Sequence, residues 1–316
     1  MMRERAHVRE VGPRDGLQLV KTILATEQKL EWCRRAAAAG VSEIEVTSFV
    51  PAKVVPQFAD ADAVARGAAA MGGFTAAALV PNLRGAERAF EAGVAKVNYV
   101  VSASEEHNLA NVRRSTQESV DDFVRVVRRR DEVAKGRVKI GGGIATAFGC
   151  TIAGAVPEER VVALAATLAK AGADEIIVAD TVGYANPRQV ERLMRAVAQE
   201  TSGVPLACHF HDTRGLGLAN VAAALEAGIR AFDASLAGLG GCPFAPGATG
   251  NINTEDCVYL LESLGLDTGI DIEALIGLRR TVEDWLPGER FSGAIARAGL
   301  PKTFRRPGAA AGAAAT

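Results

Sequence analysis

The chain has 316 residues, of which 48% are hydrophobic and 23% charged, and its 36 basic and 37 acidic side chains nearly balance. This balance gives no electrostatic footprint for nucleic acid or an anionic membrane, and no run of about 18 apolar residues predicts a membrane span. Five cysteines without a CxxC pair, and a charged start without an apolar signal segment, predict a reduced, cytoplasmic protein.

One pattern repeats along the chain: a short apolar run rich in β-branched residues precedes an Ala- and Leu-rich segment of helical period. Strands are predicted at residues 7–14, 42–49, 73–80, 96–104, 138–148, 174–183, 205–212 and 231–240. Helices are predicted between them, for example at 27–39, 118–135, 158–171, 187–200 and 216–227. Glycines suited to a left-handed helix C-cap follow four helical segments, at Gly40, Gly93, Gly172 and Gly228.

Eight strands alternating with helices predict an α/β fold that closes into a TIM (β/α)8 barrel. An open doubly wound sheet is the competing fold. It is less favoured because no glycine-rich dinucleotide turn follows the first strand. The predicted organisation is a catalytic barrel over residues 1–270, a short helical cap over 271–304 and a low-complexity, disordered tail over 305–316.

Polar side chains interrupt the apolar runs near the strand ends, where barrel enzymes have their active sites. Those with catalytic or metal-binding chemistry are Arg14, Asp15, Glu45, Asp180, His209, His211, Cys242 and Asn251. Solvent at the start of loops explains scattered polar residues, but not charged groups within runs of Val, Ile and Ala. His107, after the fourth run, is more simply interpreted as a solvated loop residue.

The segment CHFHD, residues 208–212, is the sharpest single signal. Residues two apart on a strand point to the same face, so His209 and His211 project together. Such a pair at a strand end is more often a metal clamp than a pair of core histidines. Oxygen atoms of Asp15 and Asn251 are candidates to complete it. This ligand set suits Mg²⁺ or Mn²⁺ and, less specifically, Fe²⁺, Co²⁺ or Zn²⁺.

Five segments resemble the 3-hydroxy-3-methylglutaryl-CoA (HMG-CoA) lyase family. They are VGPRDGLQ at 11–18, IEVTSFVPAKVVPQFAD at 44–60, VADTVGYANP at 178–187, CHFHDTRG at 208–215 and AGLGGCPFAPGATGNINTED at 237–256. The likeness extends from about residue 7 to 270. It implies a TIM barrel, usually a dimer, that uses Mg²⁺ or Mn²⁺ and cleaves a carbon–carbon bond of an acyl-CoA.

The resemblance also assigns roles to residues. It implies that Asp15, His209, His211 and Asn251 bind the metal and that Arg14 and Cys242 are catalytic. Glu45 and Asp180 are further polar residues of the site. Gln18, Ser48 and Asn111 are assigned to substrate binding.

The chemistry can be argued beside the likeness. Retro-Claisen cleavage releases a thioester enolate, and the fixed charge and rigid donors of Arg14 suit its stabilisation. The enolate then needs a proton, and Cys242 in its glycine-rich loop is a candidate donor or relay. The alternative is that Cys242 only fills space in a tight turn.

Three functional interpretations remain. The first is a lyase that cleaves a 3-hydroxy-3-substituted glutaryl-CoA to acetyl-CoA and a 3-oxo acid. The second is a related aldolase or Claisen-type synthase acting on a 2-oxo acid, or a lyase for a different 3-hydroxyacyl-CoA. The third is a metal-binding or sensing barrel without activity, which retention of the whole catalytic set disfavours.

The fifth predicted strand departs from the family pattern. The lyases carry a tyrosine where this chain has Gly143, within GGGIATAF. Loss of an aromatic ring from the barrel interior predicts room for a C3 substituent that is larger than methyl or of different polarity. A local misalignment, or repacking by Phe148, is the alternative.

Overall fold

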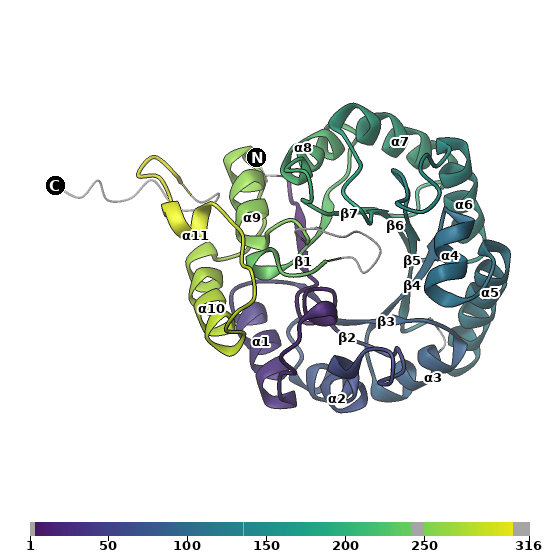
Figure 1. The fold of residues 1–316 in the computed structure, drawn as a ribbon, viewed down its shortest axis with the longest axis horizontal. Coiled ribbons are helices and arrows are strands. Elements are labelled where there is room, and N and C mark those ends of the chain that lie inside the picture. The colour runs from purple at the N-terminus through teal and green to yellow at the C-terminus, as the bar shows by residue number, and fades with distance from the viewer. Residues whose placement is uncertain (1–3, 135, 242–249, 306–316) are drawn as a thin grey trace.

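The computed structural model describes residues 4–134, 136–241 and 250–305. Its centre is a closed barrel of eight parallel strands in sequential order, ringed by helices (Figure 1). The strands are β1 (His7–Glu10), β2 (Glu43–Ser48), β3 (Thr75–Val80), β4 (Lys96–Ser102), β5 (Lys139–Ala145), β6 (Glu175–Asp180), β7 (Leu206–Phe210) and β8 (Ala231–Ala234). The TIM-barrel prediction is confirmed, and the open doubly wound sheet is excluded because β8 pairs with β1.

The helices of the ring follow the predicted periodic segments closely. They are α1 (Thr26–Ala38), α2 (Ala61–Met71), α3 (Leu83–Ala92), α4 (Glu105–Val112), α5 (Thr116–Val133), α6 (Glu158–Lys170), α7 (Pro187–Glu200) and α8 (Gly217–Glu226). All four glycines predicted to follow helices adopt positive φ, as a left-handed C-cap requires. No helix in the described ranges combines the length and the apolar character needed to cross a bilayer.

Further helices cover one side of the barrel, beside β1 and β8 (Figure 1). They are α9 (Thr254–Ser263), α10 (Ile272–Trp285) and α11 (Ile295–Ala298); α10 packs against α1 and α9, and α11 against α9. Helices therefore occur where the cap was predicted, while the division into domains stays a prediction. The predicted tail lies outside the described residues from residue 306 onward.

The first and last strands are shorter than the sequence pattern predicts. β1 ends at Glu10, and Arg14 and Asp15 lie in the following turn, where the amides of both residues donate to the carbonyl of Val11. Gly12 permits this turn because a side chain there would overlap the Trp32 ring and the Glu10 carboxylate. The turn brings Arg14 and Asp15 over the carboxyl end of the barrel.

Candidate metal and active site

Three of the predicted metal ligands form one cluster. One ligand atom from each of Asp15, His209 and His211 lies within 4.8 Å of the others. Asp15 Oδ2 is 3.7 Å from His209 Nε2 and 3.8 Å from His211 Nε2. All three residues are buried, with exposed fractions of 8%, 8% and 5%. The β-strand period that led to this prediction thus brings the two imidazoles to one face.

Asn251 joins the cluster through the backbone as well as the side chain. It forms an antiparallel bridge with His211, and its Nδ2 donates to Asp15 Oδ2 at 2.7 Å and to the Leu239 carbonyl at 3.1 Å. Its Oδ1 is buried and has no hydrogen-bond partner among the described residues. A buried, unpaired oxygen on a residue that hydrogen-bonds to Asp15 and bridges to His211 is a costly arrangement unless a cation completes it.

The two imidazoles also fit a shared ion. Their Nε2 atoms face each other at 3.1 Å. Two ligand atoms at right angles around one ion, each about 2.1 Å from it, lie about 3 Å apart. Two imidazole nitrogens with carboxylate and amide oxygens form a donor set for a divalent metal, and the residues present fit such an ion.

A neighbouring carboxylate that the sequence analysis missed orients His209. Asp233 of β8 lies opposite His209 in the register of the two strands, and its Oδ2 is 3.2 Å from His209 Nδ1. Arg9 in turn donates through Nε to Asp233 Oδ1 at 2.7 Å. A carboxylate on Nδ1 leaves the Nε2 lone pair facing the cluster, as metal-binding histidines require. These two residues are paired by the β7–β8 register, which the sequence pattern does not reveal.

The charges of the cluster shift the pKa values of its members. Burial alone raises the pKa of Asp15, but the charges of Arg14, His209 and His211 and the Asn251 hydrogen bond together lower it to about 2. Burial, reinforced by the charge of His209, lowers the pKa of His211 to about 4. Asp15 is therefore a carboxylate and His211 a neutral imidazole near pH 7, which are the forms that bind metals.

Arg14 links the cluster to a second carboxylate. Its Nη1 donates to Asp15 Oδ1 at 2.6 Å and its Nε donates to Glu45 Oε2. Glu45, assigned above to the polar residues of the site, is buried and pairs with Arg14. Arg14 Nη2 has no protein partner in the part of the chain that the structure describes. The guanidinium therefore keeps donors for a ligand beside the metal cluster.

Asp180 ends β6 at the same end of the barrel. Its carboxylate accepts the backbone amides of Tyr184 at 2.8 Å and Ala185 at 3.1 Å, and burial raises its pKa to about 6. These contacts hold the turn between β6 and α7. A catalytic role for Asp180 stays a prediction.

The predicted substrate residues are spread over the rim. Gln18 is half-buried in the short helix η1 (Gly16–Leu19) that follows the Arg14–Asp15 turn. Ser48, at the end of β2, is buried and accepts the Val50 amide at 3.3 Å. Asn111 is exposed near the end of α4. The Gln18 backbone amide donates to the backbone carbonyl of Asp15 at 3.3 Å, which places Gln18 one turn from the metal cluster. Substrate binding by these residues stays a prediction.

The prediction for His107 was wrong. His107 lies in α4, is 3% exposed, and its Nδ1 is 2.6 Å from Ser102 Oγ. Burial lowers its pKa. The His107 side chain is buried because α4 begins soon after β4, where a loop was expected.

Cys242 and the rest of residues 242–249 lie outside the described residues. The chain on either side of this segment meets the metal cluster. A Cβ at Gly240 would lie 2.5 Å from Asn251 Nδ2, and Gly250 immediately precedes Asn251. The Asp212 amide donates to the Gly250 carbonyl, which fixes this side of the segment beside the end of β7.

Comparison with known proteins agrees with this geometry. The HMGL-like family model matches residues 5–282. The (R)-citramalyl-CoA lyase of Chloroflexus aurantiacus is 45% identical over 289 residues, which cover 88% of each chain. A Pseudomonas aeruginosa protein, the 3-hydroxy-3-isohexenylglutaryl-CoA/hydroxy-methylglutaryl-CoA lyase, is 43% identical over 267 residues, 84% of this chain and 88% of that protein.

A solved structure extends the similarity to three dimensions. The HMG-CoA lyase of Acinetobacter baumannii, in complex with coenzyme A and 3-methylmalate, superposes with a TM-score of 0.89 and 43% identity. The match covers 95% of this chain and 97% of that one. With its closed barrel, its Asp–His–His cluster and a family model that spans most of its length, the chain belongs to the HMGL-like family.

Proposed function

We propose that this protein is a carbon–carbon lyase that cleaves a 3-hydroxy-3-substituted glutaryl-CoA, HMG-CoA or a close analogue, to acetyl-CoA and a 3-oxo acid. The observation that carries the proposal is a cluster of metal ligands beside an arginine with an uncommitted Nη2 group. The relatives support it because their names describe lyases of HMG-CoA, isohexenylglutaryl-CoA and citramalyl-CoA, all of which are 3-hydroxyacyl thioesters.

Cleavage breaks the bond between the carbinol carbon and the carbon next to the thioester carbonyl. A divalent metal held by Asp15, His209, His211 and Asn251 would lower the pKa of the substrate hydroxyl. As a general base takes the proton of that hydroxyl, its oxygen forms the carbonyl of the 3-oxo acid, and the electrons of the broken carbon–carbon bond pass to the thioester fragment, which leaves as an enolate. Arg14 remains protonated at every relevant pH, so it serves as the fixed donor to the enolate oxygen.

Acetyl-CoA forms when the enolate carbon takes up a proton, and we assign the donation of this proton to the Cys242 thiol. The support is its place in a segment whose two ends meet the metal cluster, at Gly240 and Gly250. A thiol close to a cation and to backbone amides has a pKa shifted toward neutrality, which suits a proton donor or relay. Replacement of Cys242 by serine should lower kcat with little effect on KM, and an unchanged kcat would favour the space-filling role.

The proposal also covers where the acyl-CoA binds, how the protein assembles and where it is located. We place the acyl-CoA at the carboxyl end of the barrel, where Gln18, Ser48 and Asn111 border the site. A coenzyme A complex of a 43% identical HMG-CoA lyase supports this ligand class. A homodimer and a cytoplasmic location follow from the family resemblance and the composition.

The direct test is turnover by the purified, Mg²⁺- or Mn²⁺-loaded protein on a panel of 3-hydroxyacyl-CoA thioesters. Release of acetyl-CoA together with a 3-oxo acid is expected from HMG-CoA or an analogue. Cleavage of 2-oxo acids instead would indicate an aldolase. Absence of acetyl-CoA from every panel member would contradict the lyase assignment.

The barrel wall at β5 bears on which C3 substituent is accepted. Gly143 pairs with Val100 of β4, and a Cβ built on it would lie 3.1 Å from Val100 Cγ2, closer than an ordinary contact, so Val100 borders this position and must shift slightly for any added side chain. Phe148, the residue expected to repack this space, instead packs against Phe210, which alternates with the site histidines and so faces away from them. A recess in the barrel wall at Gly143 would receive a substituent longer than methyl, or a carboxylate as in citramalyl-CoA.

Gly143→Tyr tests this recess. The wild type should prefer analogues with a longer or carboxylated C3 substituent over HMG-CoA, and the tyrosine should reduce kcat/KM for the larger substrates most, by about 10- to 100-fold. Gly142→Ala is the control, because that position faces Leu168 and Ile176 on the helical side of the sheet. A wild-type preference for HMG-CoA, or equal losses on all substrates, would contradict the recess.

A further inference from the structure

Glu45, the carboxylate that pairs with Arg14, also accepts a hydrogen bond from Asn98 of β4. Asn98 Nδ2 donates to Glu45 Oε1 at 2.8 Å, while Arg14 Nε donates to Glu45 Oε2. Each carboxylate oxygen thus has one donor, and Glu45 is 3% exposed. Because the carboxylate only accepts hydrogen bonds, the donating amide nitrogen of Asn98 must face it.

The oxygen atom of the Asn98 amide has no hydrogen-bond partner within the described ranges. This Oδ1 atom is buried, as is the residue as a whole, which is 91% buried. Leaving a buried carbonyl oxygen unpaired costs about 1–3 kcal/mol. An apolar residue of similar size would avoid this cost, so the favourable contact of Asn98 is the one that its nitrogen makes with Glu45.

Gly141 of β5 makes room for this amide. Asn98 and Gly141 are partners in the register of β4 and β5, and a Cβ at Gly141 would overlap Asn98 Oδ1 and lie 3.2 Å from Ile177 Cδ1. Any side chain at position 141 would therefore force the Asn98 amide to move from its observed place. The adjacent Gly142 points the other way, where a Cβ would lie 3.3 to 3.4 Å from side-chain atoms of Leu168 and Ile176, a close contact that a small shift of these side chains relieves.

The orientation of Arg14 depends on both of its carboxylate partners. Asp15 holds Nη1 and Glu45 holds Nε, which together fix the plane of the guanidinium and the direction of its free Nη2. If the Asn98 amide is removed, Glu45 Oε1 is left buried without a donor. The carboxylate then gains by turning toward the remaining donors of Arg14, which displaces the guanidinium. Stabilisation of a developing charge is sensitive to such displacements because it depends on preorganised donors.

We propose that Asn98 is a positioning residue for the lyase reaction: its amide, seated against Gly141, holds Glu45 and through it sets the orientation of Arg14 toward the thioester of the substrate. The inference rests on the proposed role of Arg14 as the donor to the enolate. Within the described residues Asn98 has no hydrogen bond to a proposed metal ligand, and the proposal is that it acts on the reaction through the geometry of Arg14.

Two variants disturb the contact from opposite sides. Asn98→Ala removes the amide, and Gly141→Ala pushes it away while leaving every polar group in place. Both should lower kcat about tenfold, with KM and the dissociation constant for Mn²⁺ changed less than twofold. Gly142→Ala is the matched control and should retain the wild-type kcat. Thermal unfolding of each variant verifies that the barrel is folded.

A double-mutant cycle separates positioning from a general structural effect. In an Arg14→Met background, Asn98→Ala should cause no further loss of kcat, because the group that it positions is gone. A wild-type kcat for Asn98→Ala, or an equal loss with and without Arg14, would overturn the inference while leaving the proposed function intact. A wild-type kcat for Arg14→Met alone would instead overturn the role of Arg14 and this inference together.

Discussion

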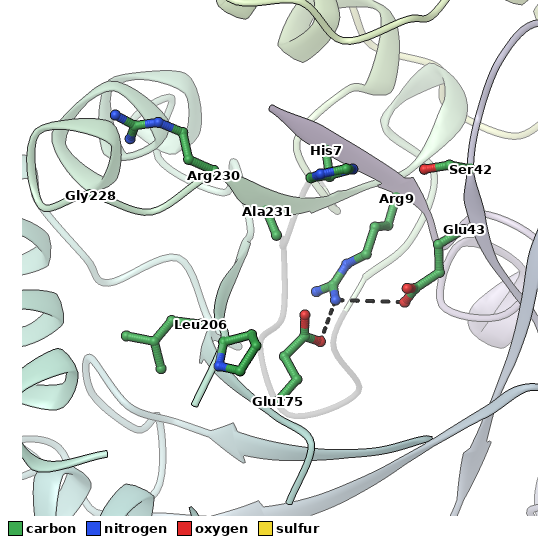
Figure 2. Close-up of a pocket in the computed structure, with 10 residues that line it drawn as sticks. His7, Arg9, Ser42, Glu43, Glu175, Leu206, Gly228, Arg230 and Ala231 are labelled. Carbon is green, nitrogen blue, oxygen red and sulfur yellow. Dashed lines mark hydrogen bonds and ion pairs between the residues drawn. The ribbon is translucent and has the colours of Figure 1, made fainter. Parts of the chain in front are cut away.

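Glu43 and Glu45 lie two residues apart on the same face of β2, yet they belong to two different regions of the barrel interior. Glu43 lies at the amino end of the strands, in a cavity of about 400 Å³ lined by His7, Arg9 and Glu175 (Figure 2). Glu45 lies one layer higher, under the metal cluster. Both are paired with an arginine, so residue type alone does not separate a structural region from a catalytic one.

The amino end is a closed set of ion pairs. Each guanidinium nitrogen of Arg9 lies within ion-pair distance of a carboxylate: Nε donates to Asp233, and Nη1 contacts Glu175 at 2.5 Å and Glu43 at 3.6 Å. Nη2 lies 2.6 Å from Asp233 Oδ1 but makes no directed hydrogen bond within the described residues. Lys96 contacts both Glu43 and Glu175 at 2.7 Å. Every charge of this group is used on another member, which is the arrangement expected of a structural network.

The carboxyl end of the barrel also contains an arginine and carboxylates, but some of its polar atoms have no protein partner within the described residues. Arg14 keeps Nη2, and Asn251 keeps a buried Oδ1 without a partner within the described ranges. The difference teaches that charge alone does not mark the region that receives a ligand. The carboxyl end is distinguished because its unpaired atoms belong to residues that contact one cluster of metal-ligand atoms, whereas Arg9 Nη2 still lies against a carboxylate. Asp233 joins the regions, since it contacts Arg9 on one side and His209 on the other.

The largest expected effect comes from removing a metal ligand. His209→Ala should lose bound metal and reduce kcat on the order of a thousandfold or more, because the metal supplies several kcal/mol of charge stabilisation. The barrel should stay folded, since catalytic metals need not hold a fold together and the amino-end ion pairs are untouched. Metal content after dialysis, steady-state kinetics and circular dichroism are the measurements.

His7→Ala is the matched control at the opposite end of the same barrel. His7 begins β1 and lines the amino-end cavity (Figure 2). This variant should keep the wild-type metal content and kcat. Full activity of metal-stripped wild-type enzyme, or equal losses in the two histidine variants, would remove the distinction between the two ends.

Removal of the uncommitted donor should have the next largest effect. Arg14→Met should lower kcat about 10²- to 10³-fold, the usual loss when one preorganised donor to an oxyanion is removed. Arg14→Lys should fall between methionine and the wild type, because one ammonium cannot serve Asp15, Glu45 and the substrate in the geometry of a guanidinium. Metal binding measured by calorimetry should persist in both variants; its loss would mean that Arg14 acts mainly by holding Asp15.

The same substitution at the two glutamates of β2 sharpens the comparison directly. Glu45→Gln should lower kcat about tenfold, because it weakens the hold on Arg14, and should change stability little. Glu43→Gln should leave kcat unchanged and cost about 1–3 kcal/mol of unfolding free energy, since Arg9 and Lys96 lose part of their charge compensation. Urea titration and kinetics of both variants test the pair. A reversed pattern would show that the structural and catalytic regions have been assigned the wrong way round.

The sequence predicted those features of the fold and site that depend on local periodicity. Alternating strand and helix patterns predicted the barrel, and the spacing of His209 and His211 predicted their common face. Asp233 and Asn98 escaped prediction because each acts across a pair of strands, with His209 on β7 and Glu45 on β2 respectively. Their partners depend on strand register and side-chain reach, which a single sequence does not encode in a visible period.

The predicted lengths of β1 and β8 and the predicted exposure of His107 were too large for a similar reason. β1 and β8 were predicted beyond Glu10 and Ala234 because their apolar patterns continue into segments that turn over the site. His107 was expected in solvent because a polar residue after a strand resembles a loop, whereas α4 starts there and buries it. In each case the tertiary packing at the carboxyl end of the barrel overrides the local pattern.

The smallest effect concerns Glu10, a buried carboxyl group at the end of β1. Its Oε1 accepts the amides of Gly12 at 2.7 Å and Leu236 at 2.9 Å, and its Oε2 accepts the Thr254 hydroxyl at 2.8 Å. Burial raises the pKa of Glu10 from an ordinary value of 4.5 to about 8. The folded protein therefore holds a proton that the unfolded chain releases between these two values.

A raised pKa of an acid stabilises the folded state fully below the unfolded value and loses this contribution as pH rises through the folded value. Stability should therefore decline between about pH 4.5 and 8, with a slope from this group of at most about 1.4 kcal/mol per pH unit. In Glu10→Gln, the amide oxygen can accept from Gly12 and Leu236 and the amide nitrogen can donate to Thr254, without titrating. The variant should match the wild type near pH 5 and exceed its unfolding free energy near pH 8, while Glu91→Gln, on the exposed face of α3, should follow the wild type throughout. Urea unfolding at several pH values measures the difference, and parallel curves for the wild type and Glu10→Gln would show that Glu10 is already ionised in the folded barrel.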